Sequence, residues 1–165
     1  MSSKKSSSRL SALILSLALL LISNVGCSKL TGRQEASAEA KGAVVRRSVE
    51  YVSQILNGKE DQLNAMIFWS DYLESKQESL NKEGYFAELK LLREKLKESG
   101  ERNPLLGLDL EDLDIRGNRA LITLGKVGHA ESPKIKIRME WVEFGWLITG
   151  DSVFGRGGLR ASGYL

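Results

Sequence analysis

The chain has 165 residues, of which 24 are Lys or Arg and 21 are Asp or Glu. Residues 1–26 hold Lys4, Lys5 and Arg9 but no acid, so the remainder is charge-balanced, which argues against a nucleic-acid-binding protein. The one cysteine excludes an internal disulfide framework and a cysteine-based zinc cluster, and the one histidine disfavours a Ser–His–Asp triad or a His-rich metal site. We therefore expect neither a metal nor a cofactor.

The first 26 residues follow the plan of a secretory signal peptide. A short basic segment precedes the apolar stretch 10–22, and small residues lead to Cys27. As a helix this stretch would span only about 20 Å, short of the roughly 30 Å hydrocarbon core, so a permanent spanning helix is the weaker interpretation. The basic end stays on the cytoplasmic side, so we expect the rest of the chain to be exported.

Val25, Gly26 and Cys27 resemble the lipobox of bacterial lipoproteins, although Asn24 stands where that family usually has Leu. The resemblance implies that Cys27 carries a diacylglycerol and further acyl chains such as palmitate, which anchor the protein to a membrane. Ser28 resembles the default residue for export to the outer membrane, with the domain facing the periplasm. An inner-membrane anchor, an uncleaved anchor helix and a secreted protein with a free thiol are the alternatives.

Small and polar side chains fill residues 27–41, which predicts a flexible tether after the lipidated cysteine. Helical spacing of apolar residues then predicts three amphipathic helices. These cover residues 42–57, 59–78 and 83–99. In the first of them, the apolar stripe is assigned to Val45, Val49, Val52 and Leu56.

After Pro104 the apolar period changes to two, which predicts strands over residues 106–115, 120–124, 135–141 and 146–154. A phase shift near Glu111–Asp112 indicates a bulge, and Gly117-Asn118 indicates a tight turn. Helices followed by closely connected strands predict an α+β domain at 42–155, with three helices packed on one face of a four-stranded antiparallel meander. The Gly- and Arg-rich end, 156–165, is predicted to be a flexible tail.

Residues 135–155 resemble the closing hairpin of the nuclear transport factor two-like (SnoaL-like) cone fold. Trp146, Ile148 and Asp151 match a strand of the type W-x-I-x-x-D that often ends this family. The family implies helices over a curved sheet, but the layout departs from it because no strand is found between the helices. A cystatin-like domain stays open, and the family includes enzymes, binders and proteins without known activity, so fold alone does not give function.

Aromatic and acidic residues supply the candidate binding site. We predict that Trp69, Tyr72, Trp141 and Asp151 could line a pocket for an apolar or ring-shaped ligand. The alternative is core packing, with Asp151 capping a turn and Trp69 reaching the surface. No residue is assigned a catalytic role, because His129 lies in a loop between two strands, far from a cone interior.

Charged residues follow two of the strands. Asp109, Glu111, Asp112 and Asp114 form an acidic cluster, in which Asp112 and Asp114 share a face and could share a proton or bind a cation. Lys134, Lys136 and Arg138 form a basic strip that could contact acidic lipid headgroups or sugar phosphates. Solvated faces of the sheet are the alternative for both. The sequence thus predicts a lipid-anchored envelope protein with a non-catalytic binding or assembly role and an envelope partner. A ligand-binding protein or enzyme with a cone pocket is the alternative.

Overall fold

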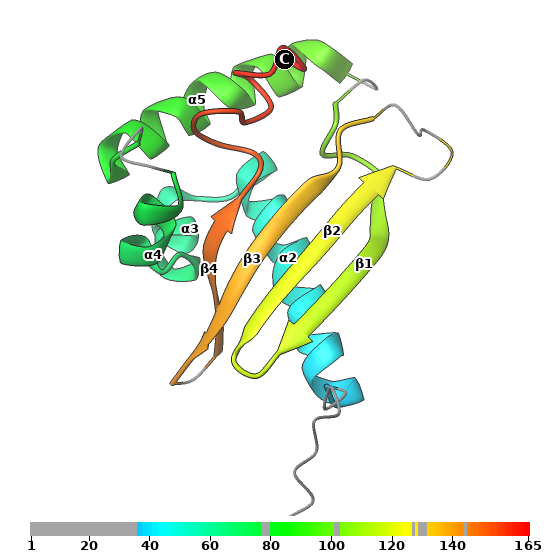
Figure 1. Cartoon of the computed structure of the whole chain (residues 1–165). Coiled ribbons are helices and arrows are strands. Elements are labelled where there is room, and N and C mark those ends of the chain that lie inside the picture. The colour runs from blue at the N-terminus through cyan, green and yellow to red at the C-terminus, as the bar shows by residue number, and fades with distance from the viewer. Residues whose placement is uncertain (1–35, 77–79, 101–102, 127, 129–131, 144) are drawn as a thin grey trace, which may run out of the picture. The chain divides into compact units, whose positions relative to one another are not determined.

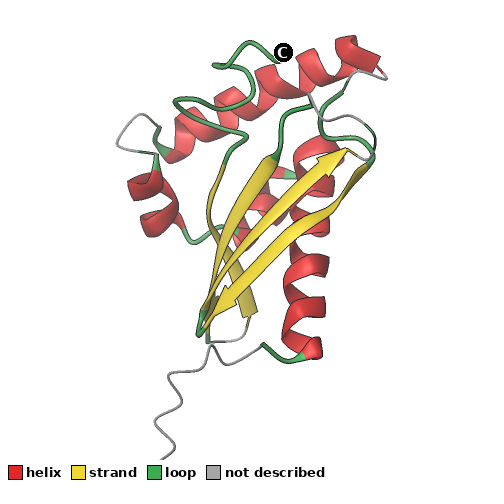
Figure 2. Cartoon of the chain, turned by 45° about the vertical axis from the view of Figure 1, so that its right-hand side comes forward, coloured by secondary structure: helices red, strands yellow, loops and turns green. Residues whose placement is uncertain are grey.

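The computed structural model describes residues 36–76, 80–100, 103–126, 128, 132–143 and 145–165. The predicted signal peptide, Cys27, most of the predicted tether and His129 lie outside these residues. The described part holds four helices followed by four strands (Figures 1 and 2). They are α2 (Ala38–Asn57), α3 (Glu60–Met66), α4 (Trp69–Ser75), α5 (Lys82–Ser99), β1 (Leu108–Arg116), β2 (Arg119–Lys126), β3 (Ile135–Val142) and β4 (Gly145–Asp151). Among the described residues, no helix has the length and apolar character needed to cross a membrane.

The strands form one antiparallel sheet in the order β1-β2-β3-β4, which confirms the predicted α+β class and meander. The pairing of β1 with β2 shifts between Leu110 and Asp112, where the bulge was predicted. The turn at Gly117-Asn118 is also confirmed, and Gly117 has a φ of 58°, a left-handed conformation that glycine adopts without a steric penalty. A second shift lies between Arg138 and Met139, opposite β4.

The predicted single helix over 59–78 is wrong, because it is two short helices. α3 ends at Met66 and α4 begins at Trp69. Between them Ile67 forms an isolated parallel bridge with Ile148, and the Phe68 N–H donates to the Ile148 carbonyl at 2.9 Å. The open edge of β4 thus offers backbone hydrogen bonds to a β-branched and an aromatic residue, both of which favour extended backbone. The prediction of three helices is therefore corrected to four.

Helix α2 lies behind the sheet and covers one of its faces (Figure 1). Its buried side differs from the predicted stripe, since Val49 is 56% exposed. Val52 of the predicted stripe is buried, together with Val44, Ser48, Tyr51 and Ile55. The Ser48 hydroxyl donates to the Val45 carbonyl at 2.8 Å, so this polar side chain is satisfied inside the core.

Helix α5 is fixed to the far end of α2 by one arginine. Arg93 Nε donates to the Ile55 carbonyl at 2.8 Å, and Nη2 donates to the Gln54 and Gly58 carbonyls at 2.8 and 2.6 Å. The carbonyls at the C-terminus of a helix have no partner within the helix, and a cation also suits the negative end of the helix dipole. Arg93 on α5 therefore supplies hydrogen-bond donors to carbonyls at the C-terminal end of α2.

Both predicted flexible ends of the domain contain ordered contacts. Helix α2 begins at Ala38, within the predicted tether, and the Ser37 side chain caps it by accepting from the Ala40 N–H at 3.1 Å. In the C-terminal segment 156–165, Leu159 is buried and its N–H donates to the Val153 carbonyl at 3.0 Å. One apolar side chain thus docks this glycine-rich segment onto the core.

Candidate functional site

A buried carboxylate joins three elements at the end of β4. The Asp151 side chain is completely inaccessible to solvent. Its Oδ2 accepts hydrogen bonds from the hydroxyls of Tyr51 on α2 and Tyr72 on α4, both at 2.6 Å. Lys76, the residue that follows α4, places its ammonium 3.1 Å from Oδ1. The carboxylate therefore connects the sheet, α2 and α4 through charge-assisted hydrogen bonds.

The same groups also fix the turn that follows β4. Asp151 Oδ1 accepts from the backbone N–H groups of Val153 at 2.7 Å and Phe154 at 3.0 Å. Lys76 Nζ donates to the carbonyls of Asp151 at 2.8 Å and Phe154 at 2.6 Å. The ammonium and the carboxylate are thus both satisfied within the protein, as burial of charge requires.

Ionisation in this buried network is set by competing effects. Burial opposes the charged form of Asp151, but the Lys76 ammonium and the two phenol hydrogen bonds outweigh it, so the pKa of Asp151 is lowered. Burial raises the pKa of Tyr51 and of Tyr72 well above the usual value, and the negative charge of Asp151 adds to this effect. Burial and Asp151 likewise raise the pKa of Tyr85. An anionic carboxylate surrounded by neutral phenols is therefore the stable state at neutral pH.

Aromatic rings surround the network and fill the interior. The Trp69 ring lies 5.9 Å from that of Tyr72 and 5.2 Å from that of Tyr85, both in edge-on arrangements. Phe154 lies 4.5 Å from Tyr85 between ring centres. Trp69 Nε1 donates to Asn64 Oδ1 at 2.8 Å, so its polar atom is also engaged. Edge-on ring contacts of this kind, with the polar atom of Trp69 hydrogen-bonded, are typical of aromatic side chains packed in a protein core.

The structure brings together three of the four predicted ligand-binding residues, namely Trp69, Tyr72 and Asp151. Trp141 lies on β3 and is 46% exposed. It is paired with Trp146 at the opposite end of β4 from Asp151, and the two rings pack edge-on with their centres 5.7 Å apart. Sequence reasoning missed Lys76 as part of the network. The i, i+4 spacing of Tyr72 and Lys76 is the signal that could have placed both on one side of the chain.

Three of the seven residues of the acidic cluster and the basic strip, Glu111, Asp114 and Lys134, form the ion pairs that the described residues show for them. Asp112 and Asp114 do share a face, opposite Thr123 and Leu121, and Asp114 forms an ion pair with Arg116 at 2.7 Å. Glu111 reaches across Gly125 of β2 to Lys134, with a distance of 2.7 Å between Oε2 and Nζ. Within the described residues, no three or more acidic, His or Cys side chains are grouped as a metal site requires.

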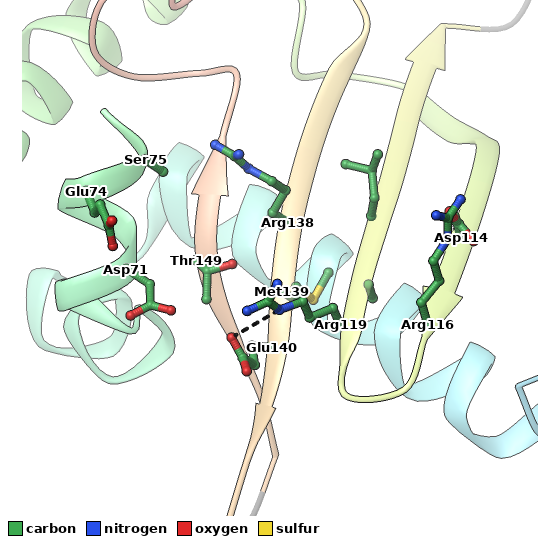
Figure 3. Close-up of a pocket in the computed structure, with 12 residues that line it drawn as sticks. Asp71, Glu74, Ser75, Asp114, Arg116, Arg119, Arg138, Met139, Glu140 and Thr149 are labelled. Atoms are coloured by element: carbon green, nitrogen blue, oxygen red, sulfur yellow. Dashed lines mark ion pairs between the residues drawn. The ribbon is translucent and has the colours of Figure 1, made fainter. Parts of the chain in front are cut away.

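The face of the sheet turned away from α2 carries an open groove of about 560 Å³. Its wall on one side is α4, and its floor crosses β4, β3, β2 and β1 (Figure 3). Its charged lining residues are Asp71, Glu74, Asp114, Arg116, Arg119, Arg138 and Glu140. The buried Asp151 network holds α4 through Tyr72 and Lys76, so it positions this wall.

Comparison with protein-family models, with curated proteins and with solved structures finds no match to this chain. The resemblance to the cone fold therefore rests on the closing hairpin with Trp146, Ile148 and Asp151. The resemblance to the lipobox rests on Val25, Gly26 and Cys27.

Proposed function

We propose that this protein is a lipid-anchored component of a bacterial envelope. It is anchored in the outer membrane, and its α+β domain is a non-catalytic binding module that faces the periplasm. The observation that carries the binding role is the contrast between the two candidate sites. The Asp151 carboxylate has its donors within the protein and is shut away from solvent, whereas the groove beside α4 is open and charged. Recognition on the outer face of the sheet is therefore favoured over chemistry in the interior.

The alternative, a ligand-binding protein or enzyme with a cone pocket, has a specific requirement. Trp69, Tyr72 and Asp151 would have to line a cavity with polar atoms free to meet a substrate. Their polar atoms are instead bonded to Asn64, to each other and to Lys76. A closed, satisfied network of this kind supports a structural role for these residues.

The membrane anchor is proposed from the leader and the cysteine. Cys27 is the one cysteine of the chain, so a thioether-linked lipid has a single possible attachment site. One acyl chain holds a protein to a bilayer only marginally, whereas two or three hold it durably. A triacylated Cys27 would therefore keep the domain in the envelope without a spanning helix.

Lipidation predicts a clear labelling result. Cells that express the wild-type protein are expected to incorporate an alkyne analogue of palmitate into it, and the mature protein should begin at Cys27 by mass spectrometry. Cys27→Ser is expected to lose the label and to keep the leader attached, because no thiol is left to acylate. Ser28→Ala, one residue away, is the matched control and should stay labelled. Label retained by Cys27→Ser, or a cut at another residue, contradicts the anchor.

The binding role predicts a site-dependent cross-link. A photo-reactive amino acid placed at Leu121, which lies in the groove, is expected to capture an envelope component in living cells. The same amino acid at Leu91 on α5 is the matched control, because both leucines are exposed but Leu91 does not line the groove. Capture with equal yield from the two positions, or from neither, contradicts recognition at the groove.

A further inference from the structure

The charges of the groove lie on two different elements. Arg138 comes from β3, while Asp71 and Glu74 come from α4 (Figure 3). Arginine and carboxylate groups pair directly where they come within hydrogen-bond distance. Here, within the described part of the chain, neither Asp71 nor Glu74 forms an ion pair with Arg138.

The position of Arg138 depends on a glycine. Gly150 is paired with Arg138 across the sheet, and a Cβ atom built on Gly150 would lie 2.8 Å from Arg138 Nη2 and 2.8 Å from Ser75 Oγ. The guanidinium therefore lies over the bare backbone of β4, close to the end of α4. A side chain at position 150 would occupy this space, since real Cβ atoms do not approach heavy atoms so closely.

Arg138 differs from the two other arginines of the groove. Arg116 is paired with Asp114 at 2.7 Å, and Arg119 lies 3.8 Å from Glu140. The Arg138 side chain makes neither an ion pair nor a hydrogen bond within the described residues. Its donors are therefore open to an anion that enters the groove, and a guanidinium can bind a carboxylate with two parallel hydrogen bonds.

The wall formed by α4 has the opposite character. Asp71 and Glu74 are three residues apart, so they lie on the same side of the helix. Asp71 accepts a hydrogen bond from the Ser70 hydroxyl at 3.0 Å, but no Lys or Arg in the described residues pairs with either acid. Two neighbouring carboxylates without a cation attract an ammonium group.

We propose that the groove binds a small zwitterion, a peptide of two to four residues with free ends, whose carboxylate meets Arg138 and whose ammonium meets Asp71 and Glu74. A purely anionic ligand would face the two carboxylates of α4, and a purely cationic one would face Arg138. Leu121 of β2 is 37% exposed and is paired across the sheet with Arg138, on the side away from α4, so it suits an apolar side chain at the carboxyl end of the peptide. A volume of about 560 Å³ is within the usual range of small-molecule sites. This inference rests on the proposed function, since it names the ligand class of the same groove.

The test is calorimetric titration of the full-length protein in detergent with Ala-Leu, Ala-Leu-Ala and Ala-Leu-Ala-Ala. At least one length is expected to bind saturably. Acetylation of its amino end, or amidation of its carboxyl end, is expected to weaken binding about tenfold or more, because each removes one charge-assisted contact. No saturable binding by any length, or equal binding of free and blocked peptides, overturns the proposal.

Variants assign each charge to its wall. Arg138→Gln is expected to weaken binding about tenfold and to abolish the preference for a free carboxyl end, and Glu74→Gln to reduce the preference for a free amino end. Lys136→Gln is the matched control, because Lys136 is exposed two residues away on the same strand and face but does not line the groove. Equal weakening by Lys136→Gln and Arg138→Gln would show a general charge effect and overturn the proposal.

Two further outcomes separate the ligand class from the proposed function. Glycerophosphoethanolamine carries an ammonium and a phosphate, so saturable binding of this probe without peptide binding would assign the groove to a lipid headgroup and overturn the peptide assignment. Loss of peptide binding while the cross-link at Leu121 persists would likewise reject the zwitterion and leave the binding role standing. Failure of both experiments rejects both.

Discussion

Asp151→Ala is expected to lower the free energy of unfolding by about 3–5 kcal/mol, the usual cost of removing one partner of a buried ion pair. The substitution leaves the Lys76 ammonium buried without its carboxylate, and it removes the acceptor of the Tyr51 and Tyr72 hydroxyls. Urea denaturation followed by far-ultraviolet circular dichroism at pH 7 measures the loss. Because α4 is held by the same carboxylate, peptide binding at the groove should fall as well.

Two further variants isolate the buried charge as the cause. Asp112→Ala removes an exposed carboxylate from the same sheet and is expected to change stability by less than about 0.5 kcal/mol. Lys76→Met in the Asp151→Ala background should recover part of the lost stability, because it removes a buried charge that has lost the Asp151 carboxylate. Equal stability of Asp151→Ala and Asp112→Ala would contradict the role assigned to the network.

Above pH 10 the domain is expected to lose stability steeply, by up to about 4 kcal/mol per pH unit. Burial, together with the charge of Asp151, raises the pKa of Tyr51, Tyr72 and Tyr85. In the unfolded chain these phenols ionise from about pH 10, whereas in the folded chain they keep their protons. The folded state then binds more protons than the unfolded state, so stability is full below pH 10 and falls as pH rises towards the folded values. Each phenol contributes about 1.4 kcal/mol per unit.

Tyrosinate absorbance and circular dichroism, recorded together during an alkaline titration, check this expectation. The three buried phenols should ionise only as the dichroism signal is lost. Tyr85→Phe should reduce the slope of stability against pH by about a third, and Tyr164→Phe, at an exposed position, is the matched control. Ionisation of all four tyrosines in a protein that keeps its full dichroism signal would contradict the closed state of the network.

The sheet could be predicted because its determinants are local. Alternation around Ile137 and Met139 and the turn at Gly117-Asn118 specify strands without reference to distant residues. The break between α3 and α4 could not be predicted, because the apolar residues of 59–78 keep a helical spacing throughout. What ends α3 is the edge of β4, where Phe68 finds the Ile148 carbonyl. Tertiary hydrogen bonds there override local propensity.

The candidate site was predictable only in part, for the same physical reason. Tyr72 and Asp151 belong to recognisable patterns, but burial of Lys76 depends on Asp151, 75 residues further along the chain. The buried side of α2 was not recognised because it includes Ser48, and a polar residue is not counted in an apolar stripe. The hydrogen bond from the Ser48 hydroxyl to the Val45 carbonyl nevertheless permits its burial. Arg138 was expected to face water, and it does, but only the fold places it beside α4.

The bridge between Ile67 and Ile148 has a consequence for self-association. An unprotected edge strand is a template for pairing with a neighbouring molecule. On the β4 side, the segment between α3 and α4 covers part of that edge, where the Phe68 N–H donates to the Ile148 carbonyl. On the β1 side, a bulge makes the backbone irregular, and the exposed acidic side chains would repel the same strand of a second molecule. Both flanks of the sheet are therefore guarded against fibril-like stacking, which would be the main hazard wherever many copies are held close together.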